Sequence, residues 1–156
     1  MAKNKTTSVK NTAEMARLLT NVLSDVYVLA IKAHVYHWNV TGPQFPNLHA
    51  FFETQYKGLP EVADEIAERI RMMGPPVRGG MAEFLANSIV KEATTKPMQA
   101  KAMIKEYLQD MQKVRDRMSA AEEFADSIDD VVTEGLMAKL MGDFDKTIWM
   151  LKSQLA

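Results

Sequence analysis

The chain has 156 residues, of which 47% are hydrophobic and 25% are charged, which is typical of one globular domain and excludes a disordered chain. Its 19 basic and 20 acidic residues give a formal net charge of −1, so the molecule as a whole does not attract nucleic acid or membranes electrostatically. Cysteine is absent, which excludes disulfides and thiolate metal sites and leaves histidine, aspartate and glutamate as the strong metal ligands.

The N-terminal residues contain no apolar segment of the kind found in signal peptides, and no run of about eighteen apolar residues occurs in the sequence. We therefore expect a soluble, cytoplasmic protein without a membrane-spanning helix. Residues 1–11 are mostly polar and are expected to form a flexible tail. Residues 12–156 are expected to form a single helical domain.

Apolar residues recur at spacings of three to four residues in four long segments, and this periodicity predicts four helices. Thr12 is the expected cap of the first helix, and Pro60 predicts a kink in the second. The four helices are expected to span residues 12–42, 46–74, 98–124 and 130–155. Residues 79–97 are expected to form a crossover with a short helix at residues 81–86. One long middle connection between four helices is typical of an all-α bundle with a crossover.

The three histidines of the chain, His34, His37 and His49, lie within 16 residues, and Asp64 and Glu68 follow on the next predicted helix. Imidazoles together with carboxylates suit a divalent transition metal, iron included. His37 lies on an apolar helix face, where a buried imidazole needs a polar partner. A metal is one such partner. From the residues alone, metal ligation and ordinary helix packing remain equal alternatives.

The spacing of four residues places Asp64 and Glu68 on one face of the second helix, because an α-helix turns about 100° per residue. That face lies roughly opposite the apolar stripe that contains Ile66 and Ile70. The two carboxylates are therefore predicted to point away from the core of their own subunit. A metal bound by these carboxylates and the histidines would then lie across a two-fold interface, with two equivalent sites per dimer.

The sequence is similar to the signature of the Dps proteins, the DNA-binding proteins from starved cells, which are ferritin-like mini-ferritins. The similar segments cover most of the chain and comprise Lys32–Phe45, Leu48–His49, Asp64–Ile70 and Thr147–Leu151. The spacings of 12, 15 and 4 residues that separate the two histidines and the two carboxylates match those of the ferroxidase ligands of that family.

The resemblance implies a hollow homododecamer of ferritin-like four-helix subunits with the short crossover helix at the two-fold interface. His37 and His49 of one subunit would then share a di-iron site with Asp64 and Glu68 of the other. The implied activity is oxidation of Fe²⁺, with hydrogen peroxide favoured over dioxygen, followed by storage of ferric mineral. Such a bacterial cytoplasmic protein would protect DNA from oxidative damage.

Each site residue has an expected role. Glu68 would bridge two irons, Asp64 and His37 would complete the tighter position, and His49 would serve the weaker one. Trp38 is either an electron donor that traps oxidising equivalents or an aromatic residue of the interface. His34, one turn before His37, either supports the ligands from outside the metal shell or only packs.

An acidic run extends from Glu122 to Glu134. In the resembled family the corresponding region lines pores on three-fold axes, where repeated acids concentrate cations. The alternative is a solvated turn that caps the fourth helix, and Gly135 stands where many relatives carry an acid. The candidate pore residues are Asp126, Asp129, Asp130 and Glu134.

Lysines of the N-terminal tail are candidate DNA contacts, because no acid precedes Glu14. They are Lys3, Lys5 and Lys10. Twelve copies on a shell would multiply a weak phosphate contact. A DNA-compacting shell is therefore the alternative function, and a helical bundle without redox chemistry is a third hypothesis.

Overall fold

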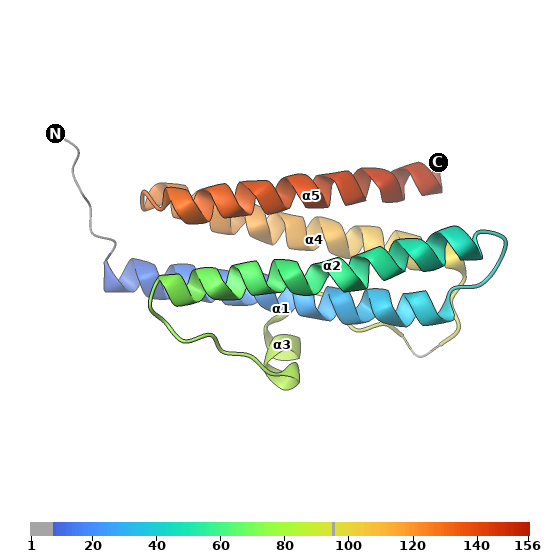
Figure 1. Cartoon of the computed structure of the whole chain (residues 1–156), viewed down its shortest axis with the longest axis horizontal. Helices are drawn as coiled ribbons and strands as arrows, with labels where there is room; N and C mark the ends of the chain where they lie inside the picture. Colours follow the sequence, from blue (N-terminus) through green and yellow to red (C-terminus); the bar gives the residue numbers. More distant parts are fainter. Residues whose placement is uncertain (1–7, 95) are drawn as a thin grey trace.

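The computed structural model describes residues 8–94 and 96–156, and over that range the chain forms helices and no strand. The helices are α1 (Val9–Asn39), α2 (Phe45–Met72), α3 (Met81–Asn87), α4 (Ala100–Ser127) and α5 (Val131–Leu155). The four long helices lie alongside one another, and the short helix α3 lies beside α1 on the outside of the bundle (Figure 1). The prediction of an all-α four-helix bundle with a crossover helix is confirmed.

The start of α1 differs from the prediction. The helix begins at Val9 and not at Thr12, because the side chain of Ser8 caps it by accepting the backbone N–H of Asn11 at 3.2 Å. Ser8 thus supplies a hydrogen bond that the first turn needs. Residues 9–11 of the expected tail therefore belong to α1, and residues 1–7 of that tail lie outside the described residues.

The other helices begin and end close to the expected residues. α2 continues on both sides of Pro60, so the proline does not divide the helix. α5 begins directly after Asp130, whose carboxylate accepts the N–H of Thr133 at 3.2 Å and caps the helix as expected. Gly42, with a φ of +105°, lies in the turn between α1 and α2, a conformation that favours glycine.

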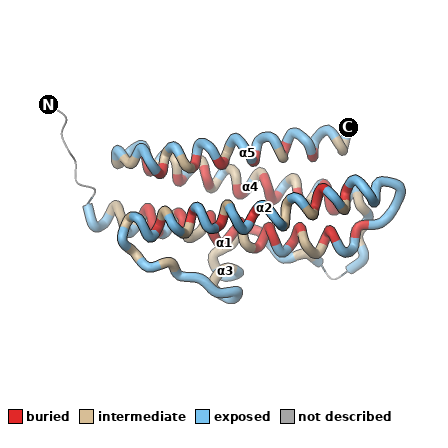
Figure 2. Tube along the Cα trace, in the orientation of Figure 1, coloured by how far each residue is buried: buried red, intermediate tan, exposed pale blue. Residues whose placement is uncertain are grey.

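The core lies where the apolar stripes of the four long helices face one another, and Figure 2 shows the buried residues along their inner sides. Each fully buried leucine, isoleucine or phenylalanine contributes roughly 1.5–3 kcal/mol through removal of apolar surface from water. Within the described residues, α1 is the one helix whose length and apolar composition would be enough to cross a membrane. Most of its apolar segment is buried in the bundle, so this composition is weak evidence for a span.

Buried polar side chains connect α1 with the rest of the bundle. Asp25 is fully buried, and its carboxylate accepts hydrogen bonds from the Ser88 hydroxyl, the Ile89 N–H and the Arg117 guanidinium. Burial raises the pKa of Asp25, although these three donors partly oppose the effect. The network ties α1 to the segment after α3 and to α4, and so fixes the crossover on the bundle.

An apolar surface remains uncovered on the side of the bundle that carries α3. No residue of α3 is buried. The exposed apolar side chains of this surface are Ile31, Met81, Leu85 and Ile89. Ile31, Met81 and Leu85 also line a cavity of about 170 Å³ between α1 and α3. Exposed apolar side chains that gather at one place, as Ile31, Met81 and Leu85 do at this cavity, are typical of a site of protein association.

Candidate metal centre

His37, near the end of α1, and His49, in the first turns of α2, form a stacked pair with ring centroids 3.7 Å apart. Their backbone contacts are reciprocal. Nδ1 of His37 lies 2.8 Å from the carbonyl oxygen of His49, and Nδ1 of His49 lies 2.9 Å from the carbonyl oxygen of His37. The turn between α1 and α2 thus holds the two rings in one fixed arrangement.

The reciprocal contacts determine which ring nitrogen is free. A carbonyl oxygen only accepts hydrogen bonds, so Nδ1 of each imidazole must carry the proton. In the neutral imidazole the lone pair then lies on Nε2, the usual metal-binding arrangement in which the other nitrogen is fixed by a carbonyl. Neither Nε2 has a hydrogen-bond partner within the described part of the chain. Two adjacent imidazole nitrogens are therefore available as metal ligands.

The carboxylates lie elsewhere. Asp64 and Glu68 are both exposed on α2, while Ile66 and Ile70 of the same helix are buried. This burial pattern confirms the prediction that the carboxylates point away from the core of their own subunit. Asp64 follows His49 by 15 residues, which corresponds to about 22 Å along a helix. Within residues 8–94 and 96–156, one subunit brings together no three histidine or acidic side chains that could hold a metal.

Aromatic rings surround the histidine pair. Tyr56 packs edge-on against His37 at a centroid distance of 5.1 Å, and His34 stacks on Tyr56 at 3.8 Å. Trp38 lies 4.0 Å from His34 and is 63% exposed in the single subunit. Tyr56 was not among the residues predicted from the sequence. Its position seven residues after His49 places it on the same face of α2, which is the signal that identifies it.

A second neighbour that the sequence analysis did not predict is Glu53, one turn after His49. Its carboxylate is bound by Lys57, which lowers the pKa of Glu53, and positive charge on either imidazole, when protonated, would act in the same direction. Glu53 is therefore a carboxylate of the same subunit close to the histidine pair, but Lys57 engages its oxygen. Residues four apart on a helix lie on the same face, so the spacing from His49 is the signal in the sequence that identifies Glu53.

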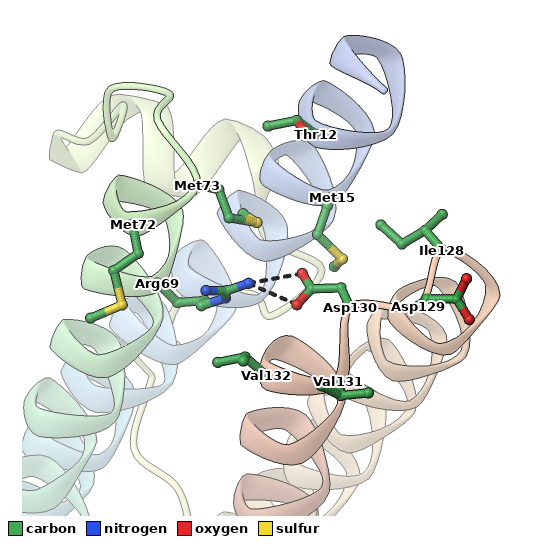
Figure 3. Close-up of a pocket in the computed structure, with 10 residues that line it drawn as sticks. All are labelled: Thr12, Met15, Arg69, Met72, Met73, Ile128, Asp129, Asp130, Val131 and Val132. Carbon is green, nitrogen blue, oxygen red and sulfur yellow. Dashed lines mark hydrogen bonds and ion pairs between the residues drawn. The ribbon is translucent and has the colours of Figure 1, made fainter. Parts of the chain in front are cut away.

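The acidic turn between α4 and α5 contains residues in different situations. The carboxylate of Asp130 accepts a hydrogen bond from Arg69 at 2.7 Å beside a pocket of about 300 Å³ that both residues line (Figure 3). It also accepts the hydroxyl of Thr133 at 2.6 Å. Burial alone would raise the pKa of Asp130, but the hydrogen bonds from Thr133 and Arg69 outweigh it and lower the pKa. In Figure 3 the carboxylate of Asp129 points away from Arg69. Asp130 thus caps α5 and links it to α2, as the capping alternative predicts.

The remaining candidate pore residues are more accessible. Asp126 and Asp129 are exposed, and Glu134 is half-buried in the first turn of α5. Asp129 has a φ of +61°, a conformation that aspartate tolerates better than most residues. The structure of one subunit leaves these three acids available to solvent, whereas the carboxylate of Asp130 is engaged.

The fold and the histidine and carboxylate positions define a ferritin-like subunit, and residues 16–156 match the family model of the ferritin-like domain. The DNA protection during starvation protein of Helicobacter pylori (strain J99) is 32% identical over 139 residues, covering 89% of this chain and 96% of the relative. The crystal structure of Dps from Staphylococcus aureus is 34% identical with a TM-score of 0.89, covering 92% of this chain and 96% of that one. The chain belongs to the Dps family of ferritin-like proteins.

Two further structures are similar over nearly the whole chain. Antigen TpF1 from Treponema pallidum is 30% identical, with a TM-score of 0.93 and 99% of both chains covered. The Dps protein of Vibrio cholerae O1 is 25% identical, with a TM-score of 0.90, and covers 99% of this chain and 100% of its own. That protein is described as a member of a broad superfamily of ferritin-like diiron-carboxylate proteins. The likeness therefore extends to a class that uses carboxylates at two-iron sites.

Proposed function

We propose that this protein is a ferroxidase and iron store that oxidises its substrate Fe²⁺ with hydrogen peroxide at sites shared by two subunits. Twelve subunits would enclose the ferric mineral. Fe²⁺ and peroxide together generate hydroxyl radicals, so their joint removal would protect DNA. The observation that carries the proposal is the reciprocal His37–His49 pair, whose backbone contacts leave both Nε2 atoms free for a metal.

The carboxylates needed to complete the site would come from the two-fold mate. Asp64 and Glu68 are too far along α2 to meet the histidines of their own chain, and both are exposed. The uncovered apolar surface around α3 supports a second copy on this side of the bundle. A symmetric contact there would create two equivalent sites, each with Asp64 of the partner subunit and Glu68 of the partner subunit facing the imidazole pair.

The donor set fits Fe²⁺. Neutral imidazoles favour Fe²⁺ over Mg²⁺ and Ca²⁺, which prefer shells made only of oxygen. Glu68 has two carboxylate oxygens and would bridge two irons, Asp64 and His37 would hold one of them, and His49 would hold the other more weakly. Four protein ligands for two ions leave positions open for water and peroxide and allow the ferric product to depart. Each Fe²⁺ supplies one electron, and Trp38 is a candidate donor of an additional electron.

Iron would enter through pores lined by the acidic turn. Three copies of Asp126, Asp129 and Glu134 around a three-fold axis would concentrate cations. Asp130 would contribute less, because Arg69 already neutralises its charge. In this turn the exposed acids are thus expected to attract iron, whereas Asp130 is expected mainly to cap α5 and to bind Arg69.

The stoichiometry of the reaction tests the proposed function. Oxidation of two Fe²⁺ by one peroxide consumes two protons and yields two Fe³⁺ and two waters, so an anaerobic titration is expected to consume about two Fe²⁺ per peroxide. A spin trap added to the mixture is expected to detect far less hydroxyl radical than in buffer alone. Consumption of one Fe²⁺ per peroxide with as much trapped radical as in buffer would refute the ferroxidase proposal.

DNA binding is the second candidate, favoured by relatives named for DNA protection during starvation and by Lys10, which is exposed in the first turn of α1. Lys3 and Lys5 lie outside the described residues. Replacing all three lysines with alanine is expected to weaken a gel shift with duplex DNA, and added salt is expected to weaken the wild-type shift. A variant with alanine at three exposed lysines elsewhere serves as the control: Lys91, Lys101 and Lys105.

Equal loss of DNA affinity in the two triple variants would refute a contact made by the N-terminal lysines. If a deletion is used, it should remove residues 1–7 only. Ser8 caps α1, and a deletion through residue 11 would also remove the first turn of the helix.

A further inference from the structure

Four aromatic side chains form a continuous series that leads away from the histidine pair. The centroid distances are 5.1 Å from His37 to Tyr56, 3.8 Å from Tyr56 to His34 and 4.0 Å from His34 to Trp38. Burial decreases in the same order: His37 is buried, Tyr56 and His34 are half-buried, and Trp38 is exposed in the single subunit. Each ring is in contact with the next.

The series results from the packing of α1 against α2. His34 and Trp38 are four residues apart on α1, so they lie on the same side of that helix. Tyr56 extends from α2 and contacts both His37, which it meets edge-on, and His34, on which it stacks at an interplanar angle of 13°. The rings of His34 and His37 lie 6.1 Å apart. Tyr56 is thereby the phenol next to a candidate ligand, and His34 separates it from the indole of Trp38.

The other tyrosines occupy different surroundings. Tyr36 and Tyr107 pack with Phe52 inside the core, and the hydroxyl of Tyr107 is buried without a hydrogen-bond partner. Oxidation of a phenol to its neutral radical requires loss of a proton, for which this fully buried hydroxyl has neither a protein acceptor nor access to solvent, whereas Tyr56 is half-buried. Tyr27 stacks on Phe84 near α3 at 4.6 Å and has no ring contact with the histidines. Tyr27 is therefore a matched control: half-buried and stacked, but separate from the series.

We propose that Tyr56 is a redox-active residue of this site and that it exchanges an electron with Trp38 through the stacked ring of His34. The inference rests on the proposed function, because peroxide is the oxidant. Reduction of one peroxide to two waters needs two electrons and two protons. When only one Fe²⁺ is present, that ion supplies one electron and Tyr56 supplies the other. The phenolic proton of Tyr56 and one proton from water complete the two waters, leaving Fe³⁺ and a tyrosyl radical.

The second step moves the oxidising equivalent outward. Trp38 gives an electron and its indole proton to the Tyr56 radical, which restores the phenol and leaves a neutral radical on Trp38. A second Fe²⁺ then reduces Trp38, which takes up one proton from water. The sum is two Fe²⁺ and one peroxide converted to two Fe³⁺ and two waters. A site that holds a single Fe²⁺ thereby releases no hydroxyl radical.

The test compares Tyr56→Phe with Tyr27→Phe in the assembled protein. Each protein receives less Fe²⁺ than it has sites, then peroxide, and is frozen for electron paramagnetic resonance. A parallel sample is digested to measure oxidised Trp38 by mass spectrometry. Wild type and Tyr27→Phe are expected to show a tyrosyl signal and oxidised Trp38. Tyr56→Phe is expected to lose the tyrosyl signal and most of the Trp38 oxidation, although Trp38 itself is unchanged.

A His34→Leu variant tests the bridge separately. It is expected to keep the tyrosyl signal and to lose most of the Trp38 oxidation, because the stacked ring between the two residues is gone. A tyrosyl signal that persists in Tyr56→Phe, or Trp38 oxidation that is the same in all variants, would overturn the inference. Either result with normal iron oxidation leaves the proposed ferroxidase intact, whereas absence of iron oxidation in wild type would refute the function itself.

Discussion

Replacing Lys32 with methionine is expected to lower the free energy of unfolding by about 3–5 kcal/mol, the cost of leaving a buried charge without its partner. The side chain of Lys32 on α1 is 1% exposed, and its ammonium lies 2.5 Å from Asp110 and 2.7 Å from Glu106, both on α4. The side chain of Asp110 is 4% exposed. Methionine preserves most of the side-chain volume of lysine, so the loss of stability reports the missing charge and not a cavity.

Lys113 provides the matched control, because it binds the other oxygen of the same Asp110 at 3.0 Å but is 52% exposed. Lys113→Met is expected to cost about 0–1 kcal/mol, as exposed ion pairs do. Adding Asp110→Leu to Lys32→Met is expected to recover much of the lost stability, since the buried carboxylate that has lost its buried partner, and keeps only the exposed Lys113, is then removed. Denaturant unfolding at one subunit concentration measures all four proteins. Equal losses for Lys32→Met and Lys113→Met would contradict the account.

The fold could be predicted because the apolar periodicity and the helix breakers agree along most of the chain. The start of α1 could not, because Ser8 and Thr12 are both good caps and the residues between them tolerate either choice. Asp130 illustrates the reverse case: the sequence places it at a helix start, and the structure shows the cap together with an ion pair to Arg69. The ion pair joins two residues that lie 61 positions apart in the sequence, which the local sequence pattern does not encode.

The direction of the carboxylates could be predicted because helix geometry alone separates Asp64 and Glu68 from the buried stripe. The reciprocal bonds of His37 and His49 could not, because they depend on the path of the turn between α1 and α2. Tyr56 was missed for a related reason. Its contact with His34 crosses from one helix to another, and only the packing of α1 on α2 creates it.

The central claim is that each metal site takes its imidazoles from one subunit and its carboxylates from another. It predicts complementation between two inactive proteins. A His37→Ala, His49→Ala subunit keeps its carboxylates, and an Asp64→Ala, Glu68→Ala subunit keeps its imidazoles. Each alone is expected to lose nearly all peroxide-dependent oxidation of Fe²⁺, because every one of its sites lacks half of the ligands. Both must retain the assembled mass of the wild type for the comparison to hold.

Coexpression of the two double variants with different affinity tags yields mixed assemblies, purified through both tags in succession. Random pairing makes about half of the two-fold contacts mixed, and each mixed contact joins the intact halves at one of its two sites, so about a quarter of the wild-type sites should be active. Initial rates of peroxide-dependent Fe²⁺ oxidation measure this. Recovery of about a quarter of the wild-type rate is the predicted result, and mixed assemblies as inactive as their parents would contradict a site shared between subunits.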